Sequence, residues 1–485
     1  MATEKLKVCI FKGDKVKMEL RKPIKFGNQK LRAGVWEVRS EILSSPHIDY
    51  FLVVGEAAEK DRLASTIKEF ESRGYSSSVI KYKGIWFAGI GPFRVPDSLQ
   101  ILSHHSVYFF PEVKRPAIAK VIARNISDGR TVQLAQHFYV SPREPFDLII
   151  YNKVGRGFHF EFEERQSYEG EIEFTIGYDG KLLLINHIEL ERYLASVISS
   201  EMLVSLPMEA LKAQAVVARN WLLTAAIKHH IGEPFDVCND DHCQEYRGIR
   251  DENNIARKVI DETRGEALYY KGKLVDTRFA KVCGGVTEEF NNVWGETFYS
   301  CSIFDGPGTY NMDLQKEDNF RLWIEQPPPA YCNTQGDTEY FEYGRKYFRW
   351  YETIDPYALR EIINNKTGID IGYPVQVNPL RRGRSGRILQ LQIKGEKGTL
   401  DVTGELKIRA ILSPTYLPSS AFYVKYNGQQ FILRGAGWGH GVGMCQVGAA
   451  KLASIGWNYR QILLHYYPNT EVRQIHVKKE ERCVS

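Results

Sequence analysis

The sequence contains no run of about 18 apolar residues, so it predicts no membrane-spanning helix. Its first residues, MATEKLKVCIFKGD, lack the apolar stretch of a secretory signal. Two explanations stay open: the protein is intracellular, or a signal or anchor has been removed from it. Internal repeats and low-complexity tails are absent as well.

Cysteine is scarce, and neither sign of charge dominates. Eight cysteines in 485 residues are too few for a disulfide scaffold. Cys301 and Cys332 flank an irregular-looking segment and could pair. Lys and Arg number 64 against 59 Asp and Glu, a net charge of +5. So small an excess favours an anionic partner such as a cell-wall polymer only weakly, and no nucleic acid partner is expected.

Composition and periodicity predict an α+β fold made mainly of antiparallel sheets, with a helical segment that carries the chemistry. Hydrophobic residues make up 43% of the chain, as in soluble globular proteins, and 40 Gly, 24 Phe and 27 Tyr indicate many strands and turns. We expect two or three strands within 5–40 and more within 96–185. The expected helices span 188–200, 207–230, 251–264, 356–366 and 446–455, whereas 300–350 looks irregular.

A small unit at 48–95 resembles a SPOR-like repeat, a family that binds peptidoglycan. A strand at 50–55 precedes an amphipathic helix at 60–72, and a hairpin over 78–90 follows. The resemblance implies a βαββ module with affinity for the cell wall. The alternative is a small α+β module of another kind.

Glu201 stands out because it ends the first of the predicted helices. A carboxyl there lies at the negative end of the helix dipole and beside the apolar Met202, which favours its protonated form. Cleavage of a glycosidic bond requires a protonated carboxyl near neutral pH. The alternative is a surface glutamate in a helix-terminal turn.

Lys212 and Arg219 lie seven residues apart, so they share one stripe of the second predicted helix. Cations on a largely apolar helix need acceptors. Glu209 is one candidate, three residues before Lys212; Glu201 or an anionic substrate is another. In the alternative interpretation, salt bridges within the protein only fix the helices.

Cys238, His242 and Cys243 lie within six residues, and His229 and His230 come just upstream. Two thiolates and two imidazoles could form a Cys2His2 zinc site. Four protein ligands leave no open position, so the expected Zn2+ is structural and fixes the loop after the second helix. Free thiols beside a solvated histidine, or a Cys238–Cys243 disulfide outside the cell, are the alternatives.

A glycine at almost every second position marks the loop 435–448, where the backbone can approach a ligand closely. The loop matches neither a phosphate loop nor a dinucleotide fingerprint, and no organic cofactor is expected. Trp438 could stack on a sugar, and His440 could contact a ligand or act as a second acid or base. A tight turn in a β-domain would explain the glycines equally well.

Two further loops could lie near a substrate. Residues 282–295 combine glycines, carboxylates and a tryptophan, and could line a cleft. A basic loop contains Arg381, Arg382, Arg384 and Arg387. It is either a solvated face or a site that steers an anionic substrate.

Together these stretches resemble the SpoIID/LytB family. The similarity includes Ser200-Glu201-Met202 and the glycine-rich loop around His440. The matching stretches are 185–194, 200–202, 209–219, 235–248, 284–288, 384–387, 417–422, 437–449 and 462–468. In family terms the chain divides into an N-terminal β segment at 1–47, the SPOR-like module at 48–95 and a catalytic domain at 96–475. The family motifs fall within 165–470, with an insert at about 300–350.

The resemblance assigns roles to particular residues. The catalytic glutamate of the family maps to Glu201, and its helix cations map to Lys212 and Arg219. A zinc site in some members matches Cys238, His242 and Cys243, with His229 or His230 as the fourth ligand. Trp438, His440 and Gln446 are the implied substrate-binding residues, and Cys283 and Cys445 stand where the family usually has serine.

The implied activity is that of a peptidoglycan lytic transglycosylase, a lyase. It cleaves the MurNAc–GlcNAc bond and closes a 1,6-anhydro ring, with Glu201 as the single acid and base. The expected partners are glycan strands, with or without their peptides, and an amidase, in the cell envelope. Sporulation and vegetative roles both stay open. The alternatives are an amidase enhancer that binds the wall without cleaving it, and zinc hydrolysis at Cys238, His242 and Cys243.

Overall fold

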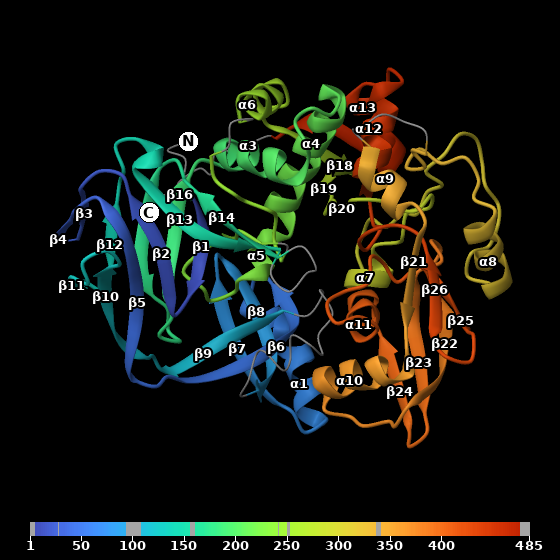
Figure 1. Cartoon of the computed structure of the whole chain (residues 1–485), viewed down its shortest axis with the longest axis horizontal. Coiled ribbons are helices and arrows are strands. Elements are labelled where there is room, and N and C mark those ends of the chain that lie inside the picture. Colours follow the sequence, from blue (N-terminus) through green and yellow to red (C-terminus); the bar gives the residue numbers. More distant parts are fainter. Residues whose placement is uncertain are drawn as a thin grey trace.

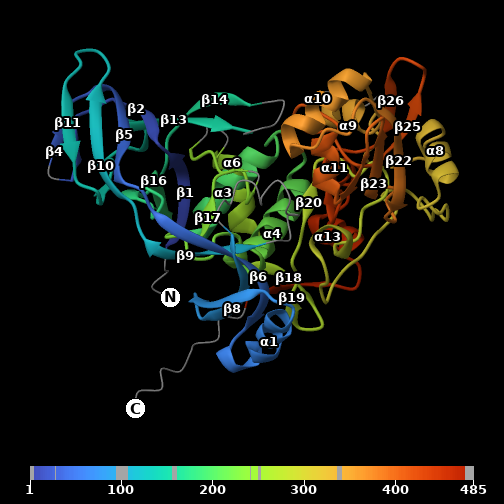
Figure 2. The same cartoon turned by 90° about the horizontal axis from the view of Figure 1, so that it is seen from below.

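The computed structural model describes residues 5–27, 29–93, 108–155, 161–240, 242–249, 253–335 and 341–475. It confirms the α+β class, with helices and mainly antiparallel sheets. Figures 1 and 2 show two β-rich lobes, one blue to green and one orange to red, on either side of a layer of helices. Within the described ranges, no helix is both long and apolar enough to cross a membrane.

The first lobe consists of two sheets that share one hydrophobic core. The first sheet, in spatial order, contains β12 (Phe138–Val140), β15 (Glu171–Ile176), β16 (Leu182–Ile188), β1 (Leu6–Gly13) and β17 (Val237–Cys238). The second contains β11 (Thr131–Leu134), β10 (Ile118–Asn125), β5 (Gly34–Ser44), β2 (Lys15–Leu20), β13 (Leu148–Val154) and β14 (Phe162–Gln166). Every second residue of β2 and β10 is buried, as expected where one sheet face covers a core.

Strands from the beginning of the chain are interleaved with later ones in this lobe. β1 pairs antiparallel with β16 and parallel with β17, and β2 pairs with β5 and β13. A small hairpin, β3 (Ile24–Phe26) with β4 (Gln29–Leu31), completes the segment. The strand pairing therefore joins 5–44 to 118–188, and more strands form in 5–44 than the two or three that were expected.

The small unit between these strands is a sheet in the order β7-β8-β6-β9 with one helix. Its elements are β6 (His47–Ala57), α1 (Ala64–Ser72), β7 (Ser76–Tyr82), β8 (Ile85–Phe93) and β9 (Phe109–Arg115). The expected strand, helix and hairpin are present, while the SPOR resemblance itself stays a prediction. Phe51, Phe87 and Phe110 pack with Ile231, so the unit lies against the loop after α5.

The helical layer lies between the two lobes (Figure 2). It contains α3 (Leu190–Glu201), α4 (Met208–Thr224), α5 (Ala226–His229), α6 (Asn253–Glu262), α12 (Gln446–Ser454) and α13 (Tyr459–Tyr466). α4 contacts α3, α6, α12 and α13, and almost every residue from Ala210 to Leu222 is buried. A helix that is apolar on nearly all sides belongs in the centre of a fold. Beside it, β18 (Glu266–Tyr270) pairs with β19 (Lys273–Leu274) and β28 (Glu471–Gln474).

The second lobe has a hydrophobic core of its own, which includes Leu359, Ile393 and Phe422. Its strands are β21 (Trp350–Ile354), β22 (Pro374–Arg382), β23 (Ile388–Gly395), β24 (Thr399–Thr403), β25 (Phe422–Tyr426) and β26 (Phe431–Gly435). Its helices are α10 (Pro356–Thr367) and α11 (Glu405–Ile411). The sheets have the orders β21-β26-β25 and β22-β23-β24.

Residues 300–350, expected to be irregular, contain two helices, α8 (Glu317–Glu325) and α9 (Glu342–Tyr347). Phe320 and Trp323 of α8 are buried with Tyr423 of β25. The helix has only nine residues, too few for its periodicity to stand out among the surrounding glycines and prolines. The short strands β20 (Phe279–Ala280) and β27 (Met444–Cys445) pair in parallel, and the short helix α7 (Asn291–Trp294) follows β20 in the sequence.

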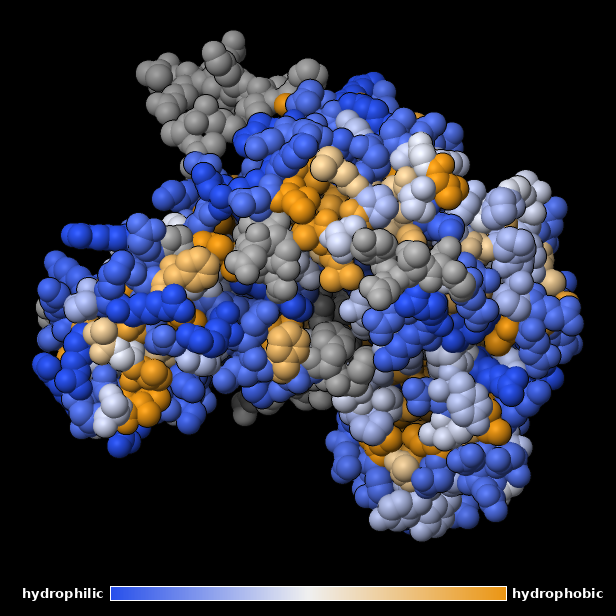
Figure 3. All heavy atoms as spheres, turned by 45° about the horizontal axis from the view of Figure 1, so that its top comes forward, coloured by the Kyte–Doolittle hydropathy of each residue, from blue (hydrophilic) through white to orange (hydrophobic). Residues whose placement is uncertain are grey.

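The surface of the protein is mainly polar on the face drawn in Figure 3. Apolar residues form small separate patches there rather than one broad face. Scattered patches of this kind are ordinary for a globular protein.

Candidate functional site

Glu201 is the last residue of α3 and is half-buried. Its Oε1 accepts a hydrogen bond of 3.0 Å from the backbone N–H of Glu245. Its carbonyl oxygen accepts a hydrogen bond of 2.7 Å from Nζ of Lys281. A cation suits this place because it meets the negative end of the helix dipole. Two loops that are distant in sequence therefore hold Glu201, one by its side chain and one by its main chain.

Glu245 brings a second carboxyl close to Glu201. Burial raises the pKa of Glu245 to about 7; Arg247 opposes this shift and the charge of Glu201 adds to it. Arg247 Nε donates to Glu245 Oε2 at 2.9 Å, and Glu245 is only 6% exposed. Two interacting carboxyls thus share the site, where a lone acid was expected. The sequence signal that was missed is the position of Glu245, two residues after the predicted metal ligand Cys243.

The loop that carries Glu245 is packed against α3 by aromatic rings and hydrogen bonds. Tyr193 of α3 stacks on Tyr246, with ring centroids 5.0 Å apart. The Tyr246 hydroxyl donates to Asn186 Oδ1 at 2.6 Å, and the Ser196 hydroxyl donates to the carbonyl of Gly248 at 2.7 Å. These buried contacts fix the loop relative to the helix that ends at Glu201.

The expectation that Lys212 orients Glu201 is not supported by its contacts. Nζ of Lys212 lies 2.7 Å from Glu209 and 2.8 Å from Glu262. Glu209 was one of the expected acceptors. Because both partners lie on helices, the contacts of Lys212 join α4 to α6.

Arg219 also has a structural environment. Its side chain is 0% exposed. Its Nε and Nη2 donate to Glu191 at 3.1 and 2.7 Å, and Nη1 donates to the carbonyl of Glu266 at 3.0 Å. Glu191 is in the first turn of α3, roughly 15 Å along the helix from Glu201. Helical spacing placed Lys212 and Arg219 on one stripe, but it could not reveal which carboxylates face that stripe.

Trp438, in the glycine-rich loop, lies near the residues that hold Glu201. Its backbone pairs with Val282, with N–H···O distances of 2.8 and 3.2 Å. Its ring lies 4.5 Å from that of Tyr347 and 5.4 Å from that of Tyr343. Nζ of Lys281 lies 5.6 Å from the Tyr343 ring. The exposed Tyr343 ring, next to the half-buried Trp438, thus lies beside the cation that contacts Glu201.

His440 lies farther along the same loop. Its Nδ1 accepts the N–H of Val442 at 3.0 Å, so a neutral ring carries its proton on Nε2. The ring contacts Trp294 edge-on at 4.6 Å, and the Arg278 guanidinium lies 4.4 Å from the Trp294 ring. His440 is therefore part of a group of aromatic and cationic side chains that includes the predicted loop 282–295.

Burial also limits two groups of residues for which a ligand contact was considered. Gln446 is 3% exposed, and its Nε2 lies 3.3 Å from Oε1 of Gln214, so it joins α12 to α4. In the basic loop, Arg382 and Arg387 are 4% and 0% exposed. Backbone carbonyls and Glu317 accept their hydrogen bonds. These side chains fix the packing because their polar groups already have partners inside the protein.

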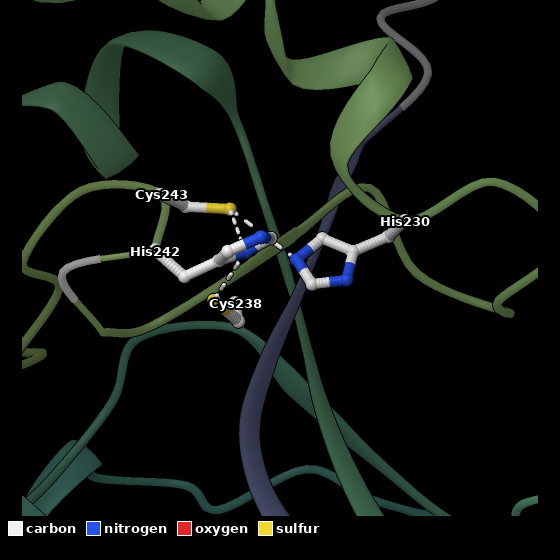
Figure 4. Close-up of side chains that lie close together, drawn as sticks. All are labelled: His230, Cys238, His242 and Cys243. Carbon is white, nitrogen blue, oxygen red and sulfur yellow. Dashed lines mark hydrogen bonds between the residues drawn. The ribbon is translucent and has the colours of Figure 1, made fainter. Parts of the chain in front are cut away.

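The predicted metal cluster is present and includes His230 rather than His229 as the fourth residue. The ligand atoms of His230, Cys238, His242 and Cys243 all lie within 4.8 Å of one another. Figure 4 shows their sulfur atoms and rings gathered around one point. His230 follows α5, Cys238 lies in β17 beside β1, and the other two lie in the next loop. We call these four residues the first cluster.

The distances in the first cluster fit a four-coordinate metal. His230 Nε2 lies 3.3 Å from Cys243 Sγ, and His242 Nδ1 lies 3.9 and 3.8 Å from the two sulfurs. Nitrogen and sulfur bound to one tetrahedral zinc lie about 3.6 Å apart. His229 Nδ1 is also 3.8 Å from Cys243, but its ring packs against Trp221. The described residues can therefore hold a metal ion here.

The cysteines that the structure describes are all free thiols. Cys301 and Cys332, which could have paired, have different neighbours. Cys301 Sγ donates to the carbonyl of Tyr466, whereas Cys332 Sγ lies 3.6 Å from Cys283 Sγ. Cys332 thereby belongs to a second group of thiols.

Comparison with known proteins agrees with this combination of fold and residues. Residues 178–270 match the family model SpoIID, Stage II sporulation protein, and residues 288–443 match a Domain of unknown function, DUF8618. The first match covers α3, Glu201, the first cluster and α6. The protein belongs to the SpoIID/LytB family.

Individual relatives match more than half of the chain. An uncharacterised protein of Brachyspira hyodysenteriae is 30% identical over 305 residues, which cover 63% of this chain and 72% of that protein. The Amidase enhancer of Bacillus subtilis is 26% identical over 293 residues, 57% of this chain and 40% of that protein. Stage II sporulation protein D of Bacillus amyloliquefaciens is 23% identical over 305 residues, 60% and 76% of the two chains.

Proposed function

We propose that the protein acts on the cell wall as a peptidoglycan lytic transglycosylase, with Glu201 as the acid and base. The observation that carries the proposal is the placement of Glu201. Its carboxyl is fixed by the Glu245 N–H at 3.0 Å, beside a second carboxyl whose pKa is about 7. The family and its relatives, an Amidase enhancer and Stage II sporulation protein D among them, agree with a role at the cell wall.

In the proposed reaction, the Glu201 carboxyl gives its proton to the glycosidic oxygen as the C1–O bond breaks. The C6 hydroxyl of the same muramic acid then bonds to C1, and the Glu201 carboxylate takes the hydroxyl proton. The 1,6-anhydro ring is closed without water, and Glu201 ends in the state in which it began. General acid–base catalysis of this kind contributes about 10²–10⁴-fold.

Glu245 controls the charge around Glu201 in this proposal. Above pH 7 its own carboxyl ionises and adds a negative charge beside Glu201. Lys281 has a positioning role, because it holds the end of α3 through the carbonyl of Glu201. Lys212 and Arg219 stabilise the helices rather than contact substrate.

Binding of the glycan is assigned to surfaces near Glu201. Trp438, with Tyr343 beside it, offers a face on which a sugar ring can stack, and His440 offers a polar contact. The module at 48–95 adds affinity for the wall. In this proposal the protein works in the cell envelope, where peptidoglycan is found.

The first cluster is assigned a structural Zn2+. Two sulfurs and two nitrogens complete a tetrahedral site and leave no position for water. The metal would fix the loop 238–248 and, through it, the N–H that Glu245 donates to Glu201. Zinc hydrolysis is disfavoured because it requires an open coordination position.

A digest of purified peptidoglycan tests the proposal, with and without prior amidase treatment. Wild type is expected to release fragments with anhydromuramic ends, and Glu201→Gln to release none. Glu189→Gln is the matched control, since Glu189 precedes the first turn of the same helix and is exposed. Cleavage by Glu201→Gln at the wild-type rate would contradict the role of Glu201.

The second candidate is an amidase enhancer that binds the wall without cleaving it. The similarity to the Amidase enhancer of Bacillus subtilis favours it. In that case wild type alone would yield no fragments, and both wild type and Glu201→Gln would increase the rate of an added amidase equally.

A further inference from the structure

A second cluster of potential metal ligands lies inside the protein, apart from the first. Cys283, Asp305, Cys332 and Cys445 place one ligand atom each within 4.8 Å of all the others. All four residues are buried. They come from the loop after β20, from the position after Phe304 in the insert, from the turn before α9 and from the residue that precedes α12. We call these four residues the second cluster.

The spacing of the second cluster resembles that of a tetrahedral metal site. The sulfurs of Cys283 and Cys332 are 3.6 Å apart, and Cys283 Sγ is 3.2 Å from Asp305 Oδ2. Two sulfurs bound to one zinc lie about 3.8 Å apart, and a sulfur and a carboxylate oxygen about 3.5 Å. A disulfide would require about 2.05 Å between sulfurs. Three cysteines would also leave one thiol unpaired.

Outer contacts orient the carboxylate of Asp305. Its Oδ1 accepts the hydroxyl proton of Tyr466 at 2.8 Å and lies 3.2 Å from Nε2 of His465. Its Oδ2 is then directed at the thiols. A carboxylate with one oxygen held by other residues and the second directed at sulfur ligands is the arrangement that metal sites use. Gly448 leaves room for the Asp305 carboxylate and the Tyr466 hydroxyl, since a Cβ at residue 448 would collide with both.

Backbone N–H groups point at the sulfurs. The N–H of Cys283 donates to Cys445 Sγ at 3.2 Å, and that of Gly448 donates to the same sulfur at 3.4 Å. The N–H of Gly285 donates to Cys283 Sγ at 3.3 Å. Such bonds favour thiolates, the form that binds metals. The guanidinium of Arg349 interacts with the charges of Cys283 and Cys332 and supplies further positive charge.

We propose that Cys283, Asp305, Cys332 and Cys445 bind a zinc ion as a second, structural metal site. Three thiolates select a soft metal, and three sulfurs with one oxygen complete a tetrahedral shell without an open position. Thiol protons leave to solvent as the metal binds. The site joins the insert, through Asp305 and Cys332, to the core that carries Cys283 and Cys445.

The second cluster would help to hold Glu201 in place without contacting it. Lys281, which donates to the Glu201 carbonyl, lies two residues before Cys283. Ala280 pairs with Cys445 across β20 and β27. A metal in the second cluster therefore fixes the short segment that carries Lys281. The inference rests on the four side chains alone and does not depend on the proposed enzymatic activity.

Zinc content of the full chain, measured by elemental mass spectrometry after zinc-supplemented expression, tests the inference. About two equivalents per chain are expected for wild type and about one for Cys238→Ala/Cys243→Ala. Adding Cys332→Ala to that double variant should remove the remaining zinc. Cys301→Ala is the matched control, because Cys301 lies near Asp305 in sequence but outside both clusters.

A spectroscopic measurement keeps the inference testable if a variant fails to fold. X-ray absorption at the zinc edge of wild type should show an average of about 2.5 sulfurs per zinc with both sites filled, against about 2 for the first cluster alone. The inference would be overturned if wild type held only one equivalent of zinc and the Cys238→Ala/Cys243→Ala variant held none. A Cys283–Cys332 disulfide in peptides mapped without reductant would also overturn it.

Discussion

The two clusters differ in how the chain assembles them. The ligands of the first lie between residues 230 and 243, and His242 is exposed. The ligands of the second extend from residue 283 to residue 445, and all are buried. Local spacing made the first cluster visible in the sequence. The second exists only after the insert has folded against the core, so that no spacing could have indicated it.

The two clusters are nevertheless alike in their relation to Glu201. Cys243 lies two residues before Glu245, whose N–H holds the Glu201 side chain. Cys283 lies two residues after Lys281, whose Nζ holds the Glu201 carbonyl. Glu201 is thus held between two loops, each next to a cluster of cysteines. The first loop acts on the carboxyl itself, and the second acts on the end of the helix.

The largest expected effect is on the free energy of unfolding, and its size should differ between the two clusters. Cys445→Ala should lower the free energy of unfolding by about 4 kcal/mol, because it removes a metal that joins distant buried segments and leaves a cavity. Cys238→Ala should cost about 2 kcal/mol, since the metal proposed for the first cluster closes only a short loop. Denaturant unfolding of both variants, with Cys301→Ala as control, measures the difference. A greater loss in Cys238→Ala would reverse the ranking.

The next effect concerns Glu245, on the loop next to the first cluster. Burial raises its pKa from 4.5 to about 7, so the folded state binds a proton that the unfolded state has released. This contribution to stability is complete below pH 4.5 and is lost as the pH rises to 7. As the pH rises from 4.5 to 8, the free energy of unfolding of Glu245→Gln should therefore increase relative to that of wild type by about 3 kcal/mol.

Chemical unfolding across that pH range checks the prediction, with the exposed Glu352→Gln as control. A constant difference between Glu245→Gln and wild type would show that Glu245 does not titrate as described.

A smaller effect is expected for Lys281, on the loop next to the second cluster. Lys281→Met removes the hydrogen bond to the Glu201 carbonyl and should lower kcat about tenfold, a loss typical of one charged hydrogen bond. KM should change little, since Lys281 acts on Glu201 rather than on the substrate. Lys281→Arg should restore part of kcat, and Lys346→Met, on the exposed side of α9, should match wild type. A change confined to KM would argue for a substrate contact instead.

The smallest expected difference is kinetic. A chelator should remove zinc from the first cluster several-fold faster than from the second, because exposed ligands exchange through small local openings and buried ligands do not. A metal-binding dye follows the two phases of release from wild type. The Cys238→Ala/Cys243→Ala variant should show the slow phase alone, and a fast phase in that variant would contradict the assignment.

The sequence predicted what depends on neighbouring residues. The helices that carry Glu201 and Lys212, the strands of the small unit and the ligands of the first cluster all appear where local patterns placed them. Long-range partners were not predictable in the same way. Arg219 pairs with Glu191 and not with Glu201, Gln446 is buried against Gln214, and Glu245 becomes a neighbour of Glu201 only through the fold.

The most direct test of the account is digestion of peptidoglycan in water enriched in heavy oxygen. If Glu201 protonates the bond and then deprotonates the C6 hydroxyl, the new muramic ends carry an anhydro ring and no heavy oxygen. Mass spectrometry of the fragments should show only such ends with wild type and no fragments with Glu201→Gln. Reducing ends that contain heavy oxygen would identify a hydrolase and contradict the account.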